Sequence, residues 1–196
     1  MLVRGSQDWV ISKLKANRAK FWDIPEQALK TYNSIDPILR LPLNPRAVAN
    51  NLNCYVLDEA KRLFDGMSNS RFEERNGTVF HHLNECTLWY KQLGDDGLPS
   101  NYPTETAKEL MQGLFPWAPR SLLLIVGFKV DQTIQRLEYV EIQRFSSTNT
   151  LQFHITLEKV TTSRVLTMPG KQTSPSRTKI AIRRSPEQEE LRVGKE

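Results

Sequence analysis

Four residues that commonly bind metal ions lie close together in the sequence: His81, His82, Glu85 and Cys86. They fall in a segment with the apolar pattern of a strand, where neighbouring side chains point to opposite faces. Only one of the two adjacent histidines can then bind a given ion. A zinc site needs three or four such ligands, and the third histidine, His154, is far along the chain. We therefore expect no metal and no cofactor, and packing or surface positions for the histidines.

Cys86 and a histidine are the residue types of a nucleophile and its base. No glycine-rich turn surrounds this cysteine, and it stands within a packing pattern, which is also expected for Cys54. Adjacent acids such as Glu73-Glu74 and Asp95-Asp96 are typical of solvated charge. The chain also has no run of glycines before a helix, as a phosphate-binding loop requires. We expect no catalytic residue and no enzymatic activity.

The formal net charge of +5 is concentrated near the C-terminus. Residues 161–186 contain six basic residues and no acidic residue, which leaves −1 for the rest of the chain. These six residues are Arg164, Lys171, Arg177, Lys179, Arg183 and Arg184. A basic tail gives little support for a folded nucleic-acid-binding surface. No apolar run approaches the roughly 18 residues of a membrane helix, so no membrane partner is expected.

Apolar residues recur at helical spacing over residues 7–22, and this segment carries two tryptophans, Trp9 and Trp22. The spacing predicts a helix that Asp23-Ile24-Pro25 interrupts, followed by a short helix to Tyr32. This segment has no obvious domain to pack on. Tryptophan is enriched at protein interfaces, so we expect Trp9 and Trp22 to contact a protein partner. Stacking on nucleic acid is the alternative.

The middle of the chain is predicted from prolines, glycines and apolar runs. Three prolines in residues 34–45 predict an extended linker. Residues 51–66 fit a strand or a helix equally well. The turn signal Asn76-Gly77 precedes two predicted strands, over residues 78–83 and 86–93. Thr104 is expected to cap a helix over residues 104–115.

Residues 121–160 have the clearest strand pattern. Residues 122–126 predict a buried strand that ends at Gly127, and residues 132–145 predict a second one. Residues 146–149 predict a turn. Apolar and polar residues then alternate from Leu151 to Leu157, which predicts a strand with one buried face and one wet or partnered face.

Within the basic tail, Ile180 and Ile182 flank Ala181. An extended segment places both isoleucines on one face, where they suit addition of a strand to a neighbour's sheet edge. The flanking cations favour an acidic partner surface. We therefore expect protein contacts through Ile180 and Ile182, the six basic residues of the tail, Trp9 and Trp22; a solvated tail is the alternative.

Residues 104–162 resemble the C-terminal half of the distal-tail-like (Dit-like) domain of bacteriophage tail and baseplate proteins. The resemblance rests on a short helix (TAKELMQGLF), a buried strand (RSLLLIVGFKV), a second strand (QTIQRLEYVEIQRF), a polar hairpin (SSTNT) and an amphipathic strand (LQFHITLEKVTTSR). The segment RFEERNGTVFHHLNECTLWYKQL aligns with the first half of that domain.

The pattern and the resemblance together predict an α+β fold: a small split β-barrel or sandwich with one inserted helix. We expect a helical N-terminal arm with a proline-rich linker over residues 1–50, a core over 51–162 and an extended basic tail over 163–196.

The resemblance implies a structural virion protein of a contractile tail baseplate, assembled in the cytoplasm of a host bacterium. Its implied partners are other tail proteins (hub, tube, sheath or wedge), with a homo-oligomeric ring as one arrangement. The alternative is a nucleic-acid-binding protein that uses the tail and the N-terminal helix. Salt dependence separates the two, because phosphate binding weakens steeply with salt.

Overall fold

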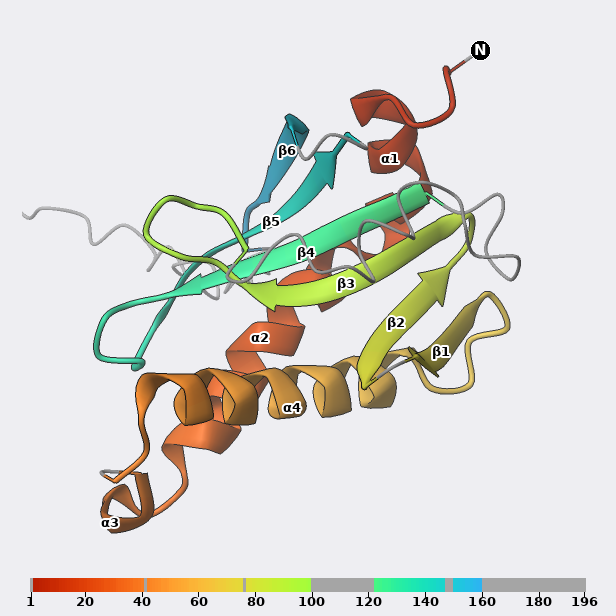
Figure 1. Ribbon diagram of the computed structural model, residues 1–196. Helices are drawn as coiled ribbons and strands as arrows, with labels where there is room; N and C mark the ends of the chain where they lie inside the picture. The colour runs from red at the N-terminus through yellow and green to blue at the C-terminus, as the bar shows by residue number, and fades with distance from the viewer. Residues whose placement is uncertain (1, 41, 76, 100–121, 147–149, 160–196) are drawn as a thin grey trace, which may run out of the picture. The chain divides into compact units, whose positions relative to one another are not determined.

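The computed structural model describes residues 2–40, 42–75, 77–99, 122–146 and 150–159. In this part of the chain, helices come first and a six-stranded sheet follows (Figure 1). The helical elements are α1 (Gln7–Leu14), the 3-10 turn η1 (Lys15–Asn17), α2 (Arg18–Asn33), α3 (Pro37–Arg40) and α4 (Pro45–Phe64). The chain is therefore an α+β protein, as the sequence predicts.

Helix α2 runs through Pro25, so the predicted interruption at residues 23–25 is wrong. The helical path instead changes earlier, at η1. A proline inside a helix removes one backbone hydrogen bond. Here Phe21, Ile24 and Ala28 are fully buried along one face, and burial of that apolar area offsets the lost bond.

Helix α4 resolves the ambiguity of residues 51–66 in favour of a helix. Leu52, Val56, Ala60 and Phe64 recur every fourth residue and are all buried. The side chain of Asn44 accepts a hydrogen bond from the Ala47 amide at the start of this helix. Pro45 occupies the first turn of α4 and Pro37 begins α3, so the extended linker predicted for residues 34–45 is wrong at these two prolines.

The strands are β1 (Ser70–Arg75), β2 (Thr78–Leu83), β3 (Cys86–Gln92), β4 (Leu122–Val130), β5 (Leu137–Phe145) and β6 (Leu151–Leu157). They lie in the sheet in chain order, and each neighbouring pair is antiparallel except the parallel pair β3 and β4. The predicted strands at 78–83, 86–93 and 151–157 are confirmed within one residue.

Two strands differ from the sequence prediction, and β1 was not expected at all. Strand β4 continues past Gly127 to Val130. Strand β5 begins at Leu137, five residues later than expected, because Asp131 closes a turn before it. The Asp131 carboxylate accepts hydrogen bonds from the backbone amides of Gln135 and Arg136.

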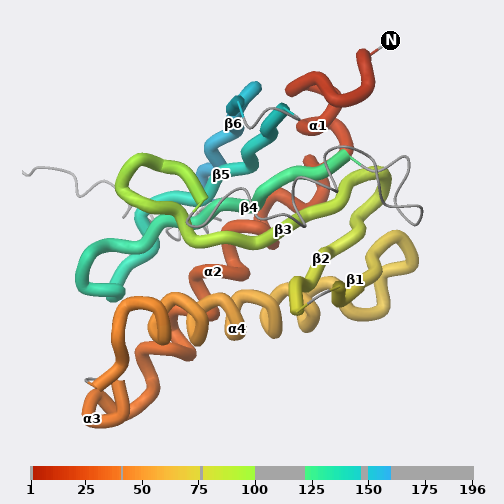
Figure 2. Tube along the Cα trace, viewed as in Figure 1, coloured from red at the N-terminus to blue at the C-terminus, as the bar shows by residue number. Residues whose placement is uncertain are grey.

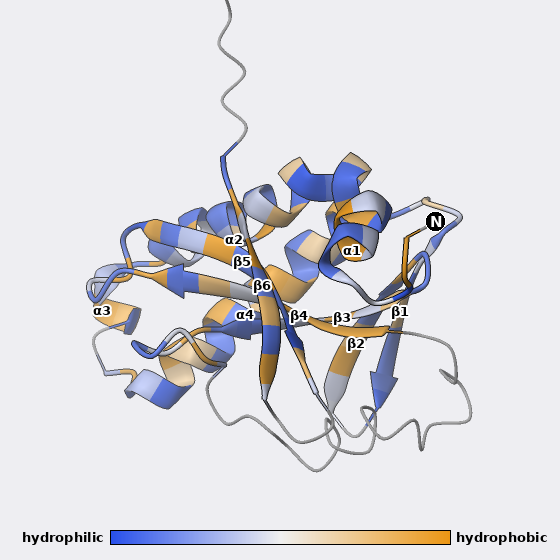
Figure 3. Cartoon of the chain, turned by 90° about the horizontal axis from the view of Figure 1, so that it is seen from above, coloured by the Kyte–Doolittle hydropathy of each residue, from blue (hydrophilic) through white to orange (hydrophobic). Residues whose placement is uncertain are grey.

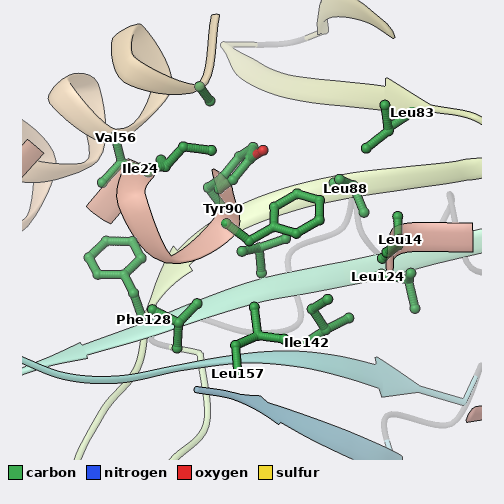
Figure 4. Close-up of a cluster of buried hydrophobic side chains, with 14 of the residues drawn as sticks. Leu14, Ile24, Val56, Leu83, Leu88, Tyr90, Leu124, Phe128, Ile142 and Leu157 are labelled. Atoms are coloured by element: carbon green, nitrogen blue, oxygen red, sulfur yellow. The ribbon is translucent and has the colours of Figure 1, made fainter. Parts of the chain in front are cut away.

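One face of the sheet carries the helices. Helix α2 packs on α4 and contacts β5 and β6, while α1 contacts β6. The path of the chain in Figure 2 shows α2 and α4 on the same side of the strands. Figure 4 shows the resulting core, where side chains of the helices meet those of the strands. Its members include Leu14, Ile24 and Val56 from the helices and Leu88, Tyr90, Leu124, Phe128, Ile142 and Leu157 from the sheet.

The described sheet has an edge at β1 and an edge at β6, since no ladder joins these two strands among the described residues. The described part thus shows an open sheet and no closed barrel. The predicted helix at 104–115, most of the turn at 146–149 and the tail from 160 onward lie outside the described residues. None of the described helices is long and apolar enough to cross a membrane.

Candidate functional site at the β6 edge

The two edge strands of the sheet have opposite chemistry. Strand β1 carries four charged residues: Arg71, Glu73, Glu74 and Arg75. Both arginines pair with Glu73, at 3.2 Å from Arg71 and 2.6 Å from Arg75. In Figure 3 this strand is mostly hydrophilic. Charge on an edge strand discourages pairing with another chain, so β1 is a protected edge.

Strand β6 has no lysine, arginine, aspartate or glutamate. Its apolar residues alternate with polar ones, which Figure 3 shows as alternating colours along the ribbon. Leu151 is 37% exposed, and Phe153 and Ile155 are half-buried. An uncharged strand with partly exposed apolar side chains is a surface on which another strand can pair.

An apolar pocket of about 310 Å³ lies beside β6 on the face that carries the helices. Its walls include Val10, Ile11 and Leu14 from α1 and Ile142, Ile155 and Leu157 from the sheet. Ile155 and Leu157 reach it because alternate residues of a strand share one face.

A second pocket, of about 440 Å³, lies on the opposite face of the sheet. The β5–β6 register pairs Glu141 with Thr156 and Gln143 with His154, so these four side chains share this face. They line the pocket together with Asp96 and Tyr139, among others. The residues that line it include two carboxylates and, in the described part of the chain, neither lysine nor arginine. We call it the acidic pocket.

Hydrogen bonds hold the side chains of the acidic pocket in place. His154 Nδ1 lies 2.6 Å from Glu141 Oε2 and donates to it, since a carboxylate only accepts. Gln143 Nε2 donates to Glu141 Oε1 at 3.0 Å and to the Gly97 carbonyl at 2.7 Å. Glu141 is only 5% exposed and Gln143 only 1%.

One buried atom of this pocket, Gln143 Oε1, accepts no hydrogen bond from any of the described residues. A buried acceptor without a donor costs free energy, so the site favours a ligand that brings one. Burial and the nearby Glu141 raise the pKa of Tyr139, which keeps its hydroxyl protonated. The pocket thus combines carboxylates and an unpaired acceptor, which suit a cationic group with several N–H donors.

The histidines singled out in the sequence behave as packing residues. His81 is fully buried, and its ring nitrogens lie 2.9 Å from Ser70 Oγ and 2.9 Å from Tyr90 Oη. Burial lowers the pKa of His81 to about 3, so its ring is neutral. His82 instead places Nδ1 3.1 Å from Thr87 Oγ1. The described residues contain no cluster of three or more His, Cys, Asp or Glu that could hold a metal ion.

Cys86 is buried in the core between the sheet and the helices. Burial raises the pKa of its thiol to about 12. A thiol of this kind stays protonated at neutral pH and is a poor nucleophile. The second cysteine, Cys54, is exposed on α4, so the packing position expected for it is wrong. Both cysteines are free thiols.

The N-terminal tryptophans lie against the chain's own core, contrary to the expectation that their helix has nothing to pack on. Trp9 is 7% exposed, with Arg4 and Lys13 above its ring at 6.0 and 5.3 Å. Trp22 is half-buried and packs on the core. Contacts within the chain therefore bury much of the side-chain surface of Trp9 and Trp22. The predicted contact residues Arg164 to Arg184, including Ile180 and Ile182, lie outside the described residues.

Sequence reasoning missed the acidic pocket. Glu141 lies between Val140 and Ile142, so a charged residue within an apolar strand was the available signal. The contact between Glu141 and His154 follows from the β5–β6 register, which the sequence pattern does not predict.

The described residues define an α+β protein with a mixed six-stranded sheet that ends at a charged strand, β1, and at a strand without charged residues, β6. No protein-family model, no curated protein and no solved structure matches the chain. The resemblance to the distal-tail-like family stays a prediction.

Proposed function

We propose that this chain is a non-catalytic assembly protein that binds its partners through the β6 edge. Its place, on this proposal, is the baseplate of a contractile bacteriophage tail, where it joins the tail tube or sheath to the central hub. The observation that carries the proposal is the difference between the two edges of the sheet. Strand β1 is charged and β6 is not.

Strand addition is the mode of binding that this edge favours. A partner strand gains main-chain hydrogen bonds from the edge and specificity from pockets on alternate side chains. The apolar pocket and the acidic pocket flank β6 on its two faces. A partner strand therefore meets side-chain pockets on both faces, in addition to backbone groups of β6 that pair with no other described strand than β5.

The resemblance to the distal-tail-like family supports the phage baseplate as the location. A split barrel, the finer form of the fold that the resemblance implies, belongs to the same proposal. Repeated head-to-tail contacts between copies, or with related tail proteins, close into rings when the rotation between neighbours permits it.

The test is incorporation into tail particles, purified from cells that produce the chain with its neighbouring reading frames. The β6 variant Leu151→Lys/Gln152→Lys places two charges on the unprotected edge. Both residues are exposed, so its melting temperature should match that of the parent. We expect at least a tenfold loss of incorporation, since lysine on an edge strand opposes pairing.

The matched control is Arg71→Lys/Glu74→Lys on β1, which should incorporate as the parent does. Normal incorporation of the β6 variant contradicts the role of this edge. Absence of the parent from tail particles contradicts the baseplate location. Binding to DNA or RNA that weakens steeply with salt would favour the nucleic-acid alternative.

A further inference from the structure

The two faces of β6 are complementary to different side chains of a strand that pairs with it. Ile155 and Leu157 border the apolar pocket, while His154 and Thr156 border the acidic pocket. A paired strand also alternates between the two faces. The matching strand therefore presents apolar residues on one face and a cation on the other.

We propose that β6 of one copy pairs with residues 178–184 of a second copy of this chain. This inference rests on the proposed function, since both use the β6 edge, and it names the partner segment. In this segment Ile180 and Ile182 lie at the centre of one face of an extended strand, between Thr178 and Arg184 at its ends, and Lys179 and Arg183 share the other face.

The apolar face of the segment fits the pocket beside α1. Side chains two residues apart on a strand are separated by about 7 Å, so Ile180 and Ile182 lie along this pocket together. Ile142, Ile155 and Leu157 supply the apolar surface that they cover.

The cationic face fits the acidic pocket. Lys179 and Arg183 are four residues apart, about 13 Å on a strand, so one of the two enters the pocket. A guanidinium offers several N–H donors in one plane. Such a group supplies the donor that Gln143 Oε1 lacks, and it neutralises the carboxylates of Glu141 and Asp96.

The distribution of charge favours this segment over Leu191 and Val193, another apolar pair near the C-terminus. Leu191 and Val193 also share a strand face, but Glu190 and Arg192 share the other, so an acid accompanies the cation on the side of the acidic pocket. Like charges facing each other across an interface disfavour pairing. Residues 161–186 carry six cations and no acid, which complements the two carboxylates of the pocket.

The experiment is sedimentation velocity on the full chain and on two defective variants. Ile180→Asp/Ile182→Asp removes the donor segment, and Leu151→Lys/Gln152→Lys blocks the acceptor edge. The parent should form concentration-dependent oligomers. Each variant alone should be monomeric, while an equimolar mixture should form a dimer, because each copy retains the half that the other lacks.

The role of the acidic pocket is tested separately. Lys179→Gln/Arg183→Gln should weaken self-association about tenfold, as expected for loss of a charge-assisted contact. Glu141→Gln, which keeps the side-chain shape, should weaken it similarly. The combined variant should lose little more than either alone, because both changes remove the same contact. If the losses of affinity in the two variants multiply in the combined variant, neither Lys179 nor Arg183 contacts Glu141, and this pairing is overturned.

A monomeric parent, or a mixture of variants that forms no dimer, overturns the inference. If the chain still enters tail particles through β6 in that case, the proposed function stands and the partner strand belongs to another protein. If self-association behaves as expected but tail particles lack the chain, the inference stands and the baseplate location fails.

Discussion

At the scale of single residues, the structure changes what His154 is expected to do. Its position on the wet face of β6 suggests a solvated side chain that tolerates substitution. The side chain is indeed 59% exposed, but its Nδ1 is also hydrogen bonded to the Glu141 carboxylate, which is almost completely buried. A buried carboxylate depends on its donors, so His154 contributes to stability as well as to the pocket.

Replacement of His154 by alanine should therefore destabilise the chain. Glu141 then keeps the hydrogen bond from Gln143, which limits the loss to about 1 kcal/mol in the free energy of unfolding. Urea denaturation at neutral pH measures it. Gln152→Ala is the matched control, because Gln152 is exposed on the same strand and does not line the acidic pocket. Equal stabilities of the two variants would contradict the His154–Glu141 bond.

His81 shows how a buried titratable group links stability to pH. Its ring stacks on Phe72 at 4.2 Å, and both ring nitrogens have hydrogen-bond partners. Burial lowers its pKa to about 3, from 6.5. Between these two pH values the unfolded chain binds a proton at His81 that the folded chain does not. The contribution of His81 to the free energy of unfolding is therefore fully present above about pH 6.5, and it is lost as the pH falls toward 3.

The expected loss from His81 between pH 6.5 and pH 5 is about 2 kcal/mol, at 1.4 kcal/mol per pH unit. Urea denaturation at several pH values measures it, and the dependence should flatten by that amount in His81→Gln. Burial also lowers the pKa of His82, so a smaller dependence of the same sign remains. A direct check is an NMR titration of the parent, in which protonation of His81 above pH 5 would contradict the prediction.

At the scale of elements, packing overrides local preference in α2 and β4. Pro25 is the residue type that most disfavours a helix interior, yet α2 contains it in a buried face. Gly127 weakens a strand interior, yet β4 continues through it. In β4 the reason is a close approach: a Cβ at Gly127 would lie 2.7 Å from Leu93 Cδ2.

Gly127→Ala should accordingly destabilise the chain by about 1–3 kcal/mol, the usual range for overpacking a core. Leu93 is buried and cannot move aside into solvent. Gly94→Ala is the control, because its Cβ meets the exposed side chain of Asp96 first. Thermal melts of both variants decide the matter. A melting temperature of Gly127→Ala equal to that of the parent would mean that Leu93 repacks freely.

At the scale of the whole molecule, stability and assembly are assigned to different parts of the chain. The buried core described here joins residues from α1, α2, α4 and all strands from β2 to β6. The excess positive charge lies beyond it, in residues 161–186. If assembly proceeds through β6 and the basic segment as proposed, variants of these parts should remove it while the core remains intact.

Neutralisation of Arg177, Lys179, Arg183 and Arg184 to glutamine tests this division. The melting temperature should stay within a few degrees of the parent, since the predicted strand pattern ends near residue 160, before these four residues. Incorporation into particles should be lost, because the cations that favour an acidic partner are gone. A collapsed melting temperature would place these residues in the core. Normal incorporation would exclude them from assembly.

The sequence by itself determined the features that depend on near neighbours. Alternation of apolar and polar residues located β6, and the turn signal at Asn76-Gly77 preceded β2 and β3 in their observed positions. These patterns are local, because residues two apart in a strand share one face. The same locality explains why the helix or strand ambiguity of residues 51–66 remained open: short apolar runs satisfy both periods.

Only the tertiary structure decided which strands are neighbours and which residues meet. The parallel pairing of β3 with β4, the helical state of Pro25 and the contact of Glu141 with His154 all depend on segments brought together by folding. Burial against distant segments supplies the free energy that overrides proline and glycine preferences. The sequence likewise did not predict that β6 lies at an edge of the described sheet, because the order of the strands within the sheet decides which strand is an edge.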